Sequence, residues 1–437
     1  MRGGSVAVVG GSIAGCAIAT AAARAGAGEV VVLERTRGRL EDRGVGLCIH
    51  DERAVELGAS GALPEGIAAH PLRRRRWVVR DATDGVGGAG GTGGAGGRVI
   101  WEQPFPFHSY HWGLLWRGLR ASVPDSVVYR QGETVTGVEG TGTAGAEVRL
   151  AGGSVERYDL VVGADGYRSV VRAAVCPESR PHYAGYVCWR GNFDAARLAE
   201  LGDAADSVPE AVTTVCFPGG TCVVYRIPGP TGPRVNWVLY APPPRDGQLR
   251  FDDPTSFPPG GLTPELARHL AALLDREFPP YWGRALALTE PADTFVQPIY
   301  DLEAARTAAG RLLLAGDAAS VVRPHNTSGA AKALQDATAL ADGWRRAESF
   351  EELLRGYEET RAPPDGNWSC SPAGWATPRS SGPGLGGHGW QRDGGVVAGA
   401  AGRGAGHRGP CHDAVGPAPP RATTRCGAAT GRRWCCW

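Results

Sequence analysis

Short apolar runs, each ending in a turn that holds glycine or an acidic residue, recur along this chain. The runs at residues 5–9 and 29–33 flank a segment of small residues at 14–25. A continuous apolar run bounded by glycine is typical of a buried parallel strand, and a longer run of small residues is typical of a helix. The order therefore predicts a strand, a helix and a second strand, the repeating unit of an α/β fold.

The turn after the first predicted strand has the glycine pattern of a dinucleotide site. Gly10 suits a tight turn, Gly15 lets helix and strand pack closely, and the first N–H groups of the helix can receive a pyrophosphate. Ser12 stands where the pattern has its middle glycine, and serine is small enough for close phosphate approach. Glu34 ends the second strand, where an acidic side chain can accept from a ribose hydroxyl. A glycine-rich turn without a ligand is the alternative.

Two later runs end in turns that carry aspartate. Residues 158–166 (YDLVVGADG) place Asp165 after a buried run, and residues 312–319 (LLLAGDAA) do the same for Asp317. A helix of small residues is predicted to begin at Gly329, after the turn Arg323-Pro324-His325. A carboxylate beside a helix start suits a ligand with several hydroxyls. Taken alone, either turn could be an ordinary surface turn or strand–helix junction.

In this order and spacing, the three motifs resemble the single-component FAD-dependent aromatic hydroxylases of the p-hydroxybenzoate hydroxylase type. The resemblance spans about residues 5–362. It implies a Rossmann-type FAD-binding domain and a β-sheet substrate domain. Further segments are similar to the 2,6-dihydroxypyridine 3-monooxygenase branch, and they lie at residues 43–47, 115–120, 183–191, 299–303 and 323–333.

We infer domain limits from this resemblance and from the strand-like alternation at residues 221–226 and 235–240. We expect a discontinuous FAD domain made of residues 1–70, 105–175 and 296–362. Residues 71–104 and 176–295 would form a sheet that covers the flavin and shapes the substrate pocket.

The resemblance also implies which residues bind the cofactor. The ADP half of FAD would lie against Gly10, Gly11, Ser12, Ile13, Ala14, Gly15, Glu34 and Arg35. The flavin half would contact Arg43, Gly46, Leu47, Arg117, Val135, Asp165, Gly166, Gly316, Asp317, Pro324 and Gly329. NAD(P)H would reduce the flavin at the same site, because the chain has no second glycine fingerprint.

The implied reaction is hydroxylation of a small aromatic substrate with NAD(P)H and O₂ through a flavin C4a-hydroperoxide. A phenol or hydroxypyridine attacks that species best as its anion, so a nearby base helps. His325 is the candidate base, and a histidine that only packs or caps a helix is the alternative. His50 and Tyr186 are candidates for substrate contact, whereas His108 and His111 are expected to satisfy local hydrogen bonds.

Other functions stay open at this point. The same fold could carry out epoxidation, Baeyer–Villiger oxidation or oxidative decarboxylation, or the chain could bind FAD without activity.

Composition and charge limit the kinds of binding partner that we expect. A formal net charge of +1 over 437 residues gives no reason to expect nucleic acid or an acidic membrane. The basic run at residues 73–76 is expected to be a solvated strand edge. No stretch is long and apolar enough to cross a bilayer, and the amino terminus lacks a signal-peptide pattern. The 11 cysteines show no metal-like spacing, so we expect reduced thiols, a cytoplasmic location and no metal; a homodimer is the assembly considered.

Two segments have unusual composition. Residues 84–97 are almost entirely Gly, Ala and Thr, which predicts a mobile loop. The tail at residues 363–437 is crowded with Gly, Pro, Arg, Trp and Cys and is expected to be disordered. A small secreted disulfide module is one interpretation, but a cytoplasmic enzyme is not expected to carry one. One base of frame shift in GC-rich DNA would explain the tail, since codons for residues 367–378 can also encode the amphipathic segment Leu-Val-Val-Leu-Ser-Arg-Arg-Leu. Resequencing the gene tests this hypothesis, and an intact frame would contradict it.

Overall fold

The computed structural model describes residues 3–38, 40, 45–81, 96–140, 142–202, 210–244 and 261–361. Arg43, most of the glycine-rich segment at 84–97 and the tail from Pro363 lie outside the described residues. Their predicted roles therefore stay predictions.

A mostly parallel sheet, here called the Rossmann sheet, confirms the strand–helix–strand prediction. Its six strands run in the order β16 (Ala308–Ala309), β17 (Leu312–Leu314), β10 (Leu160–Gly163), β1 (Ser5–Val9), β2 (Glu29–Glu34) and β6 (Val127–Gln131). Only β16 runs antiparallel to its neighbour. Parallel strands need connections that cover both faces of the sheet, which explains why these strands are apolar on both sides.

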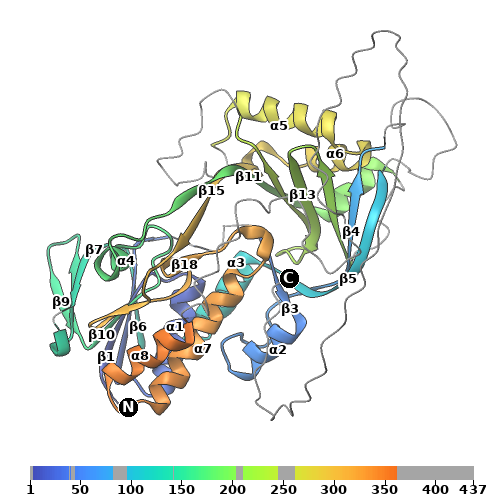
Figure 1. The fold of residues 1–437 in the computed structure, drawn as a ribbon. Helices are drawn as coiled ribbons and strands as arrows, with labels where there is room; N and C mark the ends of the chain where they lie inside the picture. Colours follow the sequence, from blue (N-terminus) through green and yellow to red (C-terminus); the bar gives the residue numbers. More distant parts are fainter. Residues whose placement is uncertain are drawn as a thin grey trace, which may run out of the picture. The chain divides into compact units, whose positions relative to one another are not determined.

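Alternate residues of β1 point into two different cores. Val6 and Val8 pack with the helices α1 (Ile13–Ala25), α3 (Trp112–Ala121), α7 (Gly329–Arg346) and α8 (Phe350–Arg361). Ala7 and Val9 pack with α4 (Val170–Val175) and with a smaller sheet of β7 (Val135–Gly140), β8 (Ala146–Leu150) and β9 (Val155–Tyr158). Helices α1 and α7 lie side by side on the first face (Figure 1).

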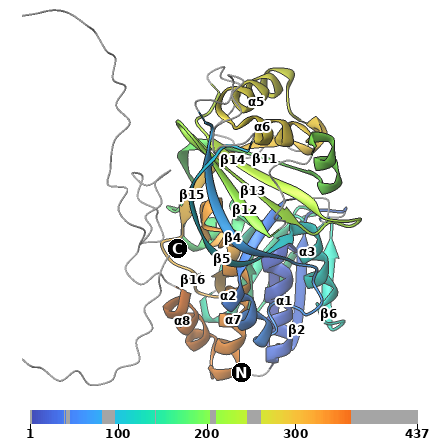
Figure 2. The same ribbon diagram turned by 90° about the vertical axis from the view of Figure 1, so that its right-hand side faces the viewer.

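A second, mostly antiparallel sheet, here called the large sheet, carries nine strands. Their order is β18 (Ser320–Val321), β15 (Phe295–Glu303), β11 (His182–Asp194), β14 (Arg234–Ala241), β13 (Gly220–Ile227), β12 (Ala211–Phe217), β4 (His70–Val79), β5 (Arg98–His111) and β3 (Gly46–His50). Helices α5 (Pro264–Glu277) and α6 (Pro280–Ala287) cover one face, which Figure 2 shows above strands β11, β13 and β14. That outer face buries Trp189 and Trp237 completely.

Shorter elements complete the described chain. They are α2 (Asp51–Ala59) and the 3₁₀ turns η1 (Gly142–Ala144), η2 (Ala195–Leu201), η3 (Pro291–Asp293), η4 (Gly316–Ala318) and η5 (Pro324–Asn326). None of the helices in these described ranges is long and apolar enough to cross a bilayer.

One expectation about the basic run is wrong. Strand β4, which holds Arg74, Arg75 and Arg76, pairs with β12 on one side and β5 on the other, so it is not an edge strand. Alternation along the strand exposes Arg74 and leaves Arg75 half-buried on the face opposite α6. Four consecutive arginines do not predict which of them are exposed, because side chains of successive strand residues point to opposite faces of the sheet.

Candidate active site

The turn at residues 10–15, here called the fingerprint turn, is built on close backbone contacts. Gly10 has a φ of +99°, and a Cβ there would lie 2.5 Å from the Ala164 carbonyl oxygen. A Cβ on Gly15 would lie 1.9 Å from the Gly10 carbonyl oxygen. Glycine is therefore the only residue that fits at either position without moving the backbone.

Gly11 is held by polar contacts on both sides of its peptide. Its N–H donates to Glu34 Oε2 over 2.7 Å. Its carbonyl accepts from the Trp116 indole over 2.9 Å and from the Tyr129 hydroxyl over 2.8 Å. The sequence gave no signal for Trp116 or Tyr129, because both reach the turn from elements more than 100 residues away.

Glu34 is buried beside this turn. Its second carboxylate oxygen accepts the Thr36 N–H over 2.8 Å, so both oxygens already receive one donor. Each carboxylate oxygen has a further lone pair available to a hydroxyl. Arg35 is exposed at the end of the same strand.

Helix α1 starts directly after the fingerprint turn. Ser12 is its N-cap and makes no side-chain capping bond, while Ile13 and Ala14 are buried in the first turn. The N–H groups of a first helical turn lack partners within the helix. They are thus available to an anionic group.

The late motif reaches the fingerprint turn through Gly316. A Cβ on Gly316 would lie 2.8 Å from the Ala14 Cβ, and its φ is +59°. The middle motif meets the same turn where Gly10 approaches Ala164 and Asp165. The structure therefore brings together all three motifs that the sequence singled out.

Asp165 has an unused acceptor at this junction. Its Oδ2 accepts the Val170 N–H over 2.7 Å, while the buried Oδ1 has no hydrogen-bond partner within the described ranges. Burial raises the pKa of this carboxyl. Gly166 follows with a φ of +79°, and Val135 is buried at the start of β7.

Charged side chains of α7 and α8 hold the Gly316–Asp317 turn in place. Asp336 is 1% exposed and accepts the Gly316 N–H over 2.7 Å. Its carboxylate also binds Lys332 Nζ at 3.3 Å and Arg361 Nε at 2.6 Å. Lys332 donates in addition to the Gly316 carbonyl over 3.2 Å. Asp317 itself is exposed, so its carboxylate is free to meet a ligand.

The remaining predicted flavin contacts come from separate elements. Arg117 is exposed on α3, and Leu47 follows Gly46 on β3. The Gly46 N–H donates to Asn236 Oδ1 over 2.8 Å, which links β3 to β14, a strand that is not its neighbour in the large sheet. Gly329 begins α7.

His325 lies in the turn η5 together with Pro324, between two aromatic rings of the large sheet. Its ring centroid lies 5.1 Å from that of Tyr240 and 6.1 Å from that of Tyr186. Burial and the neighbouring Arg323 guanidinium lower the pKa of His325 to about 4. Arg323 is itself bound to Asp301 by two hydrogen bonds. Two predicted residues, His325 and Tyr186, are thus brought together, and Tyr240 joins them.

The three other histidines that the sequence singled out make local contacts. His50 caps α2 by accepting the Glu52 N–H and packs edge-on against Phe107. His111 caps α3, as expected, by accepting from Gly113. His108 bonds to Asp51 Oδ1 over 2.8 Å.

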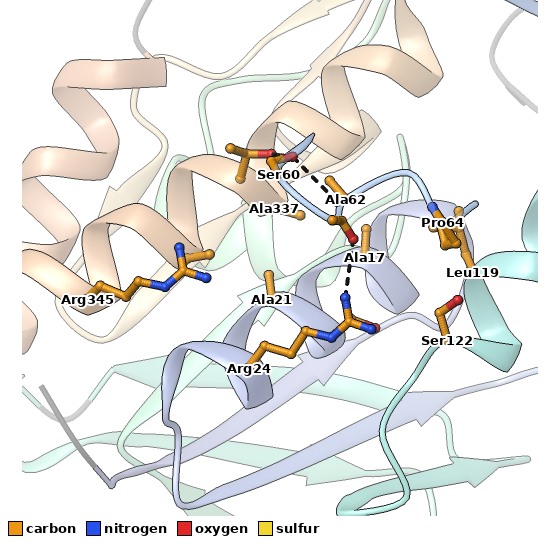
Figure 3. Close-up of a pocket in the computed structure, with 14 residues that line it drawn as sticks. Ala17, Ala21, Arg24, Ser60, Ala62, Pro64, Leu119, Ser122, Ala337 and Arg345 are labelled. Carbon is orange, nitrogen blue, oxygen red and sulfur yellow. Dashed lines mark hydrogen bonds between the residues drawn. The ribbon is translucent and has the colours of Figure 1, made fainter. Parts of the chain in front are cut away.

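A small surface hollow lies along the later half of α1. Figure 3 shows its lining, which is mainly alanine, serine and the two arginines Arg24 and Arg345. The described residues here offer no acid–base pair. No group of metal-ligating side chains occurs within the described ranges either.

Comparisons with known proteins identify the family. Residues 183–301 match a family described as FAD binding domain-like, and residues 273–365 match one described as FAD binding domain. The chain is 29% identical to 2,6-dihydroxypyridine 3-monooxygenase of Paenarthrobacter nicotinovorans, covering 81% of this chain and 86% of that protein. It is 30% identical to 3-amino-4-hydroxybenzoate 2-monooxygenase PtmB3 of Streptomyces platensis, covering 82% of this chain and 84% of that protein.

This chain belongs to the FAD-dependent aromatic monooxygenases.

The solved structures agree with this assignment. The structure of 2,6-dihydroxypyridine-3-hydroxylase from Arthrobacter nicotinovorans shares 25% identity with a TM-score of 0.67, over 82% of this chain and 87% of that one. The predicted α/β fold and the predicted family are thereby confirmed. Aromatic ring hydroxylation is favoured over the other oxidations that the sequence left open.

The site of this monooxygenase fits FAD on its own geometry. Glycines at positions 10 and 15 let the turn lie against backbone that a Cβ would strike, the start of α1 has no side-chain cap, and Asp165 holds a buried oxygen without a partner among the described residues. A dinucleotide with two phosphates and several hydroxyls complements these groups.

We predict that Gly11→Ala lowers FAD content several-fold. A Cβ at Gly11 would lie 2.0 Å from the Tyr129 hydroxyl, so either the fingerprint turn or the Tyr129 ring that holds it must move. The measurement is the flavin-to-protein absorbance ratio of the purified chain. Gly38→Ala is the matched control, because nothing lies within 4 Å of that position. Equal flavin content in both variants would contradict the prediction, and Tyr129→Ala added to Gly11→Ala should restore part of the binding.

We also predict that Asp336→Asn destabilises the fold by about 3 kcal/mol or more, because it leaves buried Lys332 and half-buried Arg361 without the counter-charge of Asp336. Denaturant unfolding of the full chain measures the change. Asp342→Asn on the same helix is the control, since Asp342 makes only an exposed ion pair with Arg345. A similar, small effect of both changes would show that the Asp336 network does not hold the turn.

Proposed function

We propose that this chain hydroxylates a small phenolic or hydroxypyridine-type ring, using bound FAD with NAD(P)H and O₂. The observation that carries the proposal is the cluster of His325, Tyr186 and Tyr240 where the turn η5 meets the large sheet. Flat aromatic side chains at edge-on and tilted angles suit a flat aromatic substrate. When bound, reduced FAD would supply the oxygen atom from O₂.

We propose the following residues as the FAD site. Gly10, Gly15 and the start of α1 would hold the pyrophosphate, and Glu34 would accept from a ribose hydroxyl. Asp165 and Asp317 would accept from further hydroxyls, and the η5 turn would border the ring system. The domain limits given by the sequence belong to the same proposal, with the Rossmann sheet binding FAD and the large sheet shaping the substrate pocket.

His325 would orient the substrate hydroxyl rather than remove its proton outright. A pKa of about 4 keeps the imidazole neutral at pH 7, so it can accept a hydrogen bond. A phenol with a pKa near 10 does not transfer its proton fully to so weak a base. We therefore propose His325 as a catalytic hydrogen-bond acceptor beside the ring.

We further propose a cytoplasmic location and a homodimer. The free thiols of all six described cysteines support a reducing compartment. Sedimentation or light scattering of the purified chain would measure the assembly.

The function is tested with purified full-length protein. We expect a yellow protein that oxidises NAD(P)H faster when a phenol or hydroxypyridine is added, with one hydroxyl added to the ring by mass spectrometry. Reduced-nicotinamide oxidation that never yields a hydroxylated ring would contradict the proposal, and colourless protein that takes up no added FAD would overturn it entirely.

The pKa of His325 gives a separate prediction. Between about pH 4 and pH 6.5 the unfolded chain binds more protons at this residue than the folded chain. The stability that neutral His325 contributes is therefore complete above pH 6.5 and is lost as the pH falls towards 4. NMR titration of the imidazole, assigned by its loss in His325→Gln, should show a midpoint well below the ordinary value. A midpoint at 6 or above would contradict it.

A further inference from the structure

Two donors on neighbouring strands of the large sheet face away from α5 and α6. Arg190 on β11 lies directly opposite Val238 on β14. Asn236 is two residues along β14 and so projects to the same face. The residues between them on each strand, such as Trp189 and Trp237, belong to the core under the helices. Arg190 and Asn236 therefore share the inner face with Tyr186 and Tyr240.

Asn236 is buried and Arg190 is half-buried, and each has one buried donor atom without a hydrogen-bond partner among the described residues. Asn236 is 2% exposed; its Oδ1 accepts the Gly46 N–H, but its Nδ2 has no hydrogen-bond partner among the described residues. The Nε of Arg190 is likewise buried without a partner in the described part of the chain. In the described part of the chain, the Arg190 charge interacts with Cys188, which is also a hydrogen-bond partner, and with Tyr240 and Tyr225; none of these is a carboxylate. A buried N–H donor without an acceptor is costly, so an acceptor from outside the chain is expected at these two donor atoms.

Arg75 adds positive charge to the same face. Its Nε donates to Thr214 Oγ1 over 3.0 Å, and its guanidinium lies 4.8 Å from the centre of the Trp77 ring. Burial lowers the pKa of Arg75, and the Arg75 charge also lowers the pKa of His325.

Asp301 is the acid that acts on His325 in this region, and it is already bound to Arg323. The groups that act on the charges of Arg75 and Arg190 are tyrosines and cysteines of the described chain, not carboxylates.

A carboxylate matches this set of donors. It has two oxygens that can accept from a guanidinium and an amide together, and it is ionised at all pH values above about 4. The oxygen of a phenol carries charge only near pH 10, so it cannot serve as a permanent counter-ion.

We propose that the substrate is an aromatic ring bearing a carboxylate, which Arg190 and Asn236 bind on the inner face of the large sheet with Arg75 in support. This inference rests on the proposed function and selects hydroxybenzoate-type rings over neutral hydroxypyridines.

The test uses FAD-loaded full-length protein and pairs of ligands. Each hydroxybenzoate of a panel is titrated beside its own carboxamide, which has the same shape without the charge, and dissociation constants are read from changes in the flavin spectrum. We expect at least one acid to bind about tenfold or more tightly than its amide, the size expected for a charge-assisted hydrogen bond. Arg190→Gln should bring that ratio close to one, and Arg190→Lys should retain part of it.

Arg74→Gln is the control, because Arg74 is exposed on β4 and pairs with Glu102. It should keep the wild-type ratio, and unchanged flavin content and melting temperature show that each variant is folded. Amides that bind as tightly as their acids, or an acid preference that survives Arg190→Gln, would overturn the inference. Turnover of neutral hydroxypyridines alone would overturn it while leaving the proposed function intact, whereas a panel that shows neither binding nor turnover would remove both.

Discussion

The whole site depends on how closely three backbone turns can approach one another. Gly10, Gly15 and Gly316 each occupy a position where a Cβ would lie within 3 Å of a neighbouring turn or helix. Removing side chains at these points allows the carboxyl ends of β1, β10 and β17 to converge on the start of α1. Parallel strands place their carboxyl ends along one sheet edge, and the glycines turn that edge into a continuous lining for an extended ligand.

Such a lining must also be rigid, and buried polar contacts supply the rigidity. The Gly11 peptide is held through its N–H and its carbonyl by three side chains from different elements. The Gly316 peptide is held in the same way by Asp336 and Lys332. Each contact satisfies a backbone group that would otherwise be buried without a partner. Three of the buried polar groups that lack a partner among the described residues, on Asp165, Arg190 and Asn236, stand where ligands are proposed.

The sequence was most informative where function restricts the local backbone. Glycines and acids at the ends of apolar runs located β1, α1, β2, β10 and β17, because these residue types are required by tight turns. Contacts that depend on sheet pairing could not be foreseen. Tyr129 reaches Gly11 because β6 pairs with β2, and Tyr240 reaches His325 because the large sheet meets η5. The prediction that residues 73–76 form a solvated strand edge failed for the same reason, since the exposure of these arginines depends on which strands flank β4.

Lys332 is the only lysine in the chain, and it is buried against the Gly316 carbonyl and Asp336. Amine-directed reagents can therefore modify the interior of this protein at a single place, and only when the turn before Asp317 opens. The rate of acylation at Lys332 would count those openings directly. Acylation of this single side-chain amine therefore reports local unfolding at the cofactor turn.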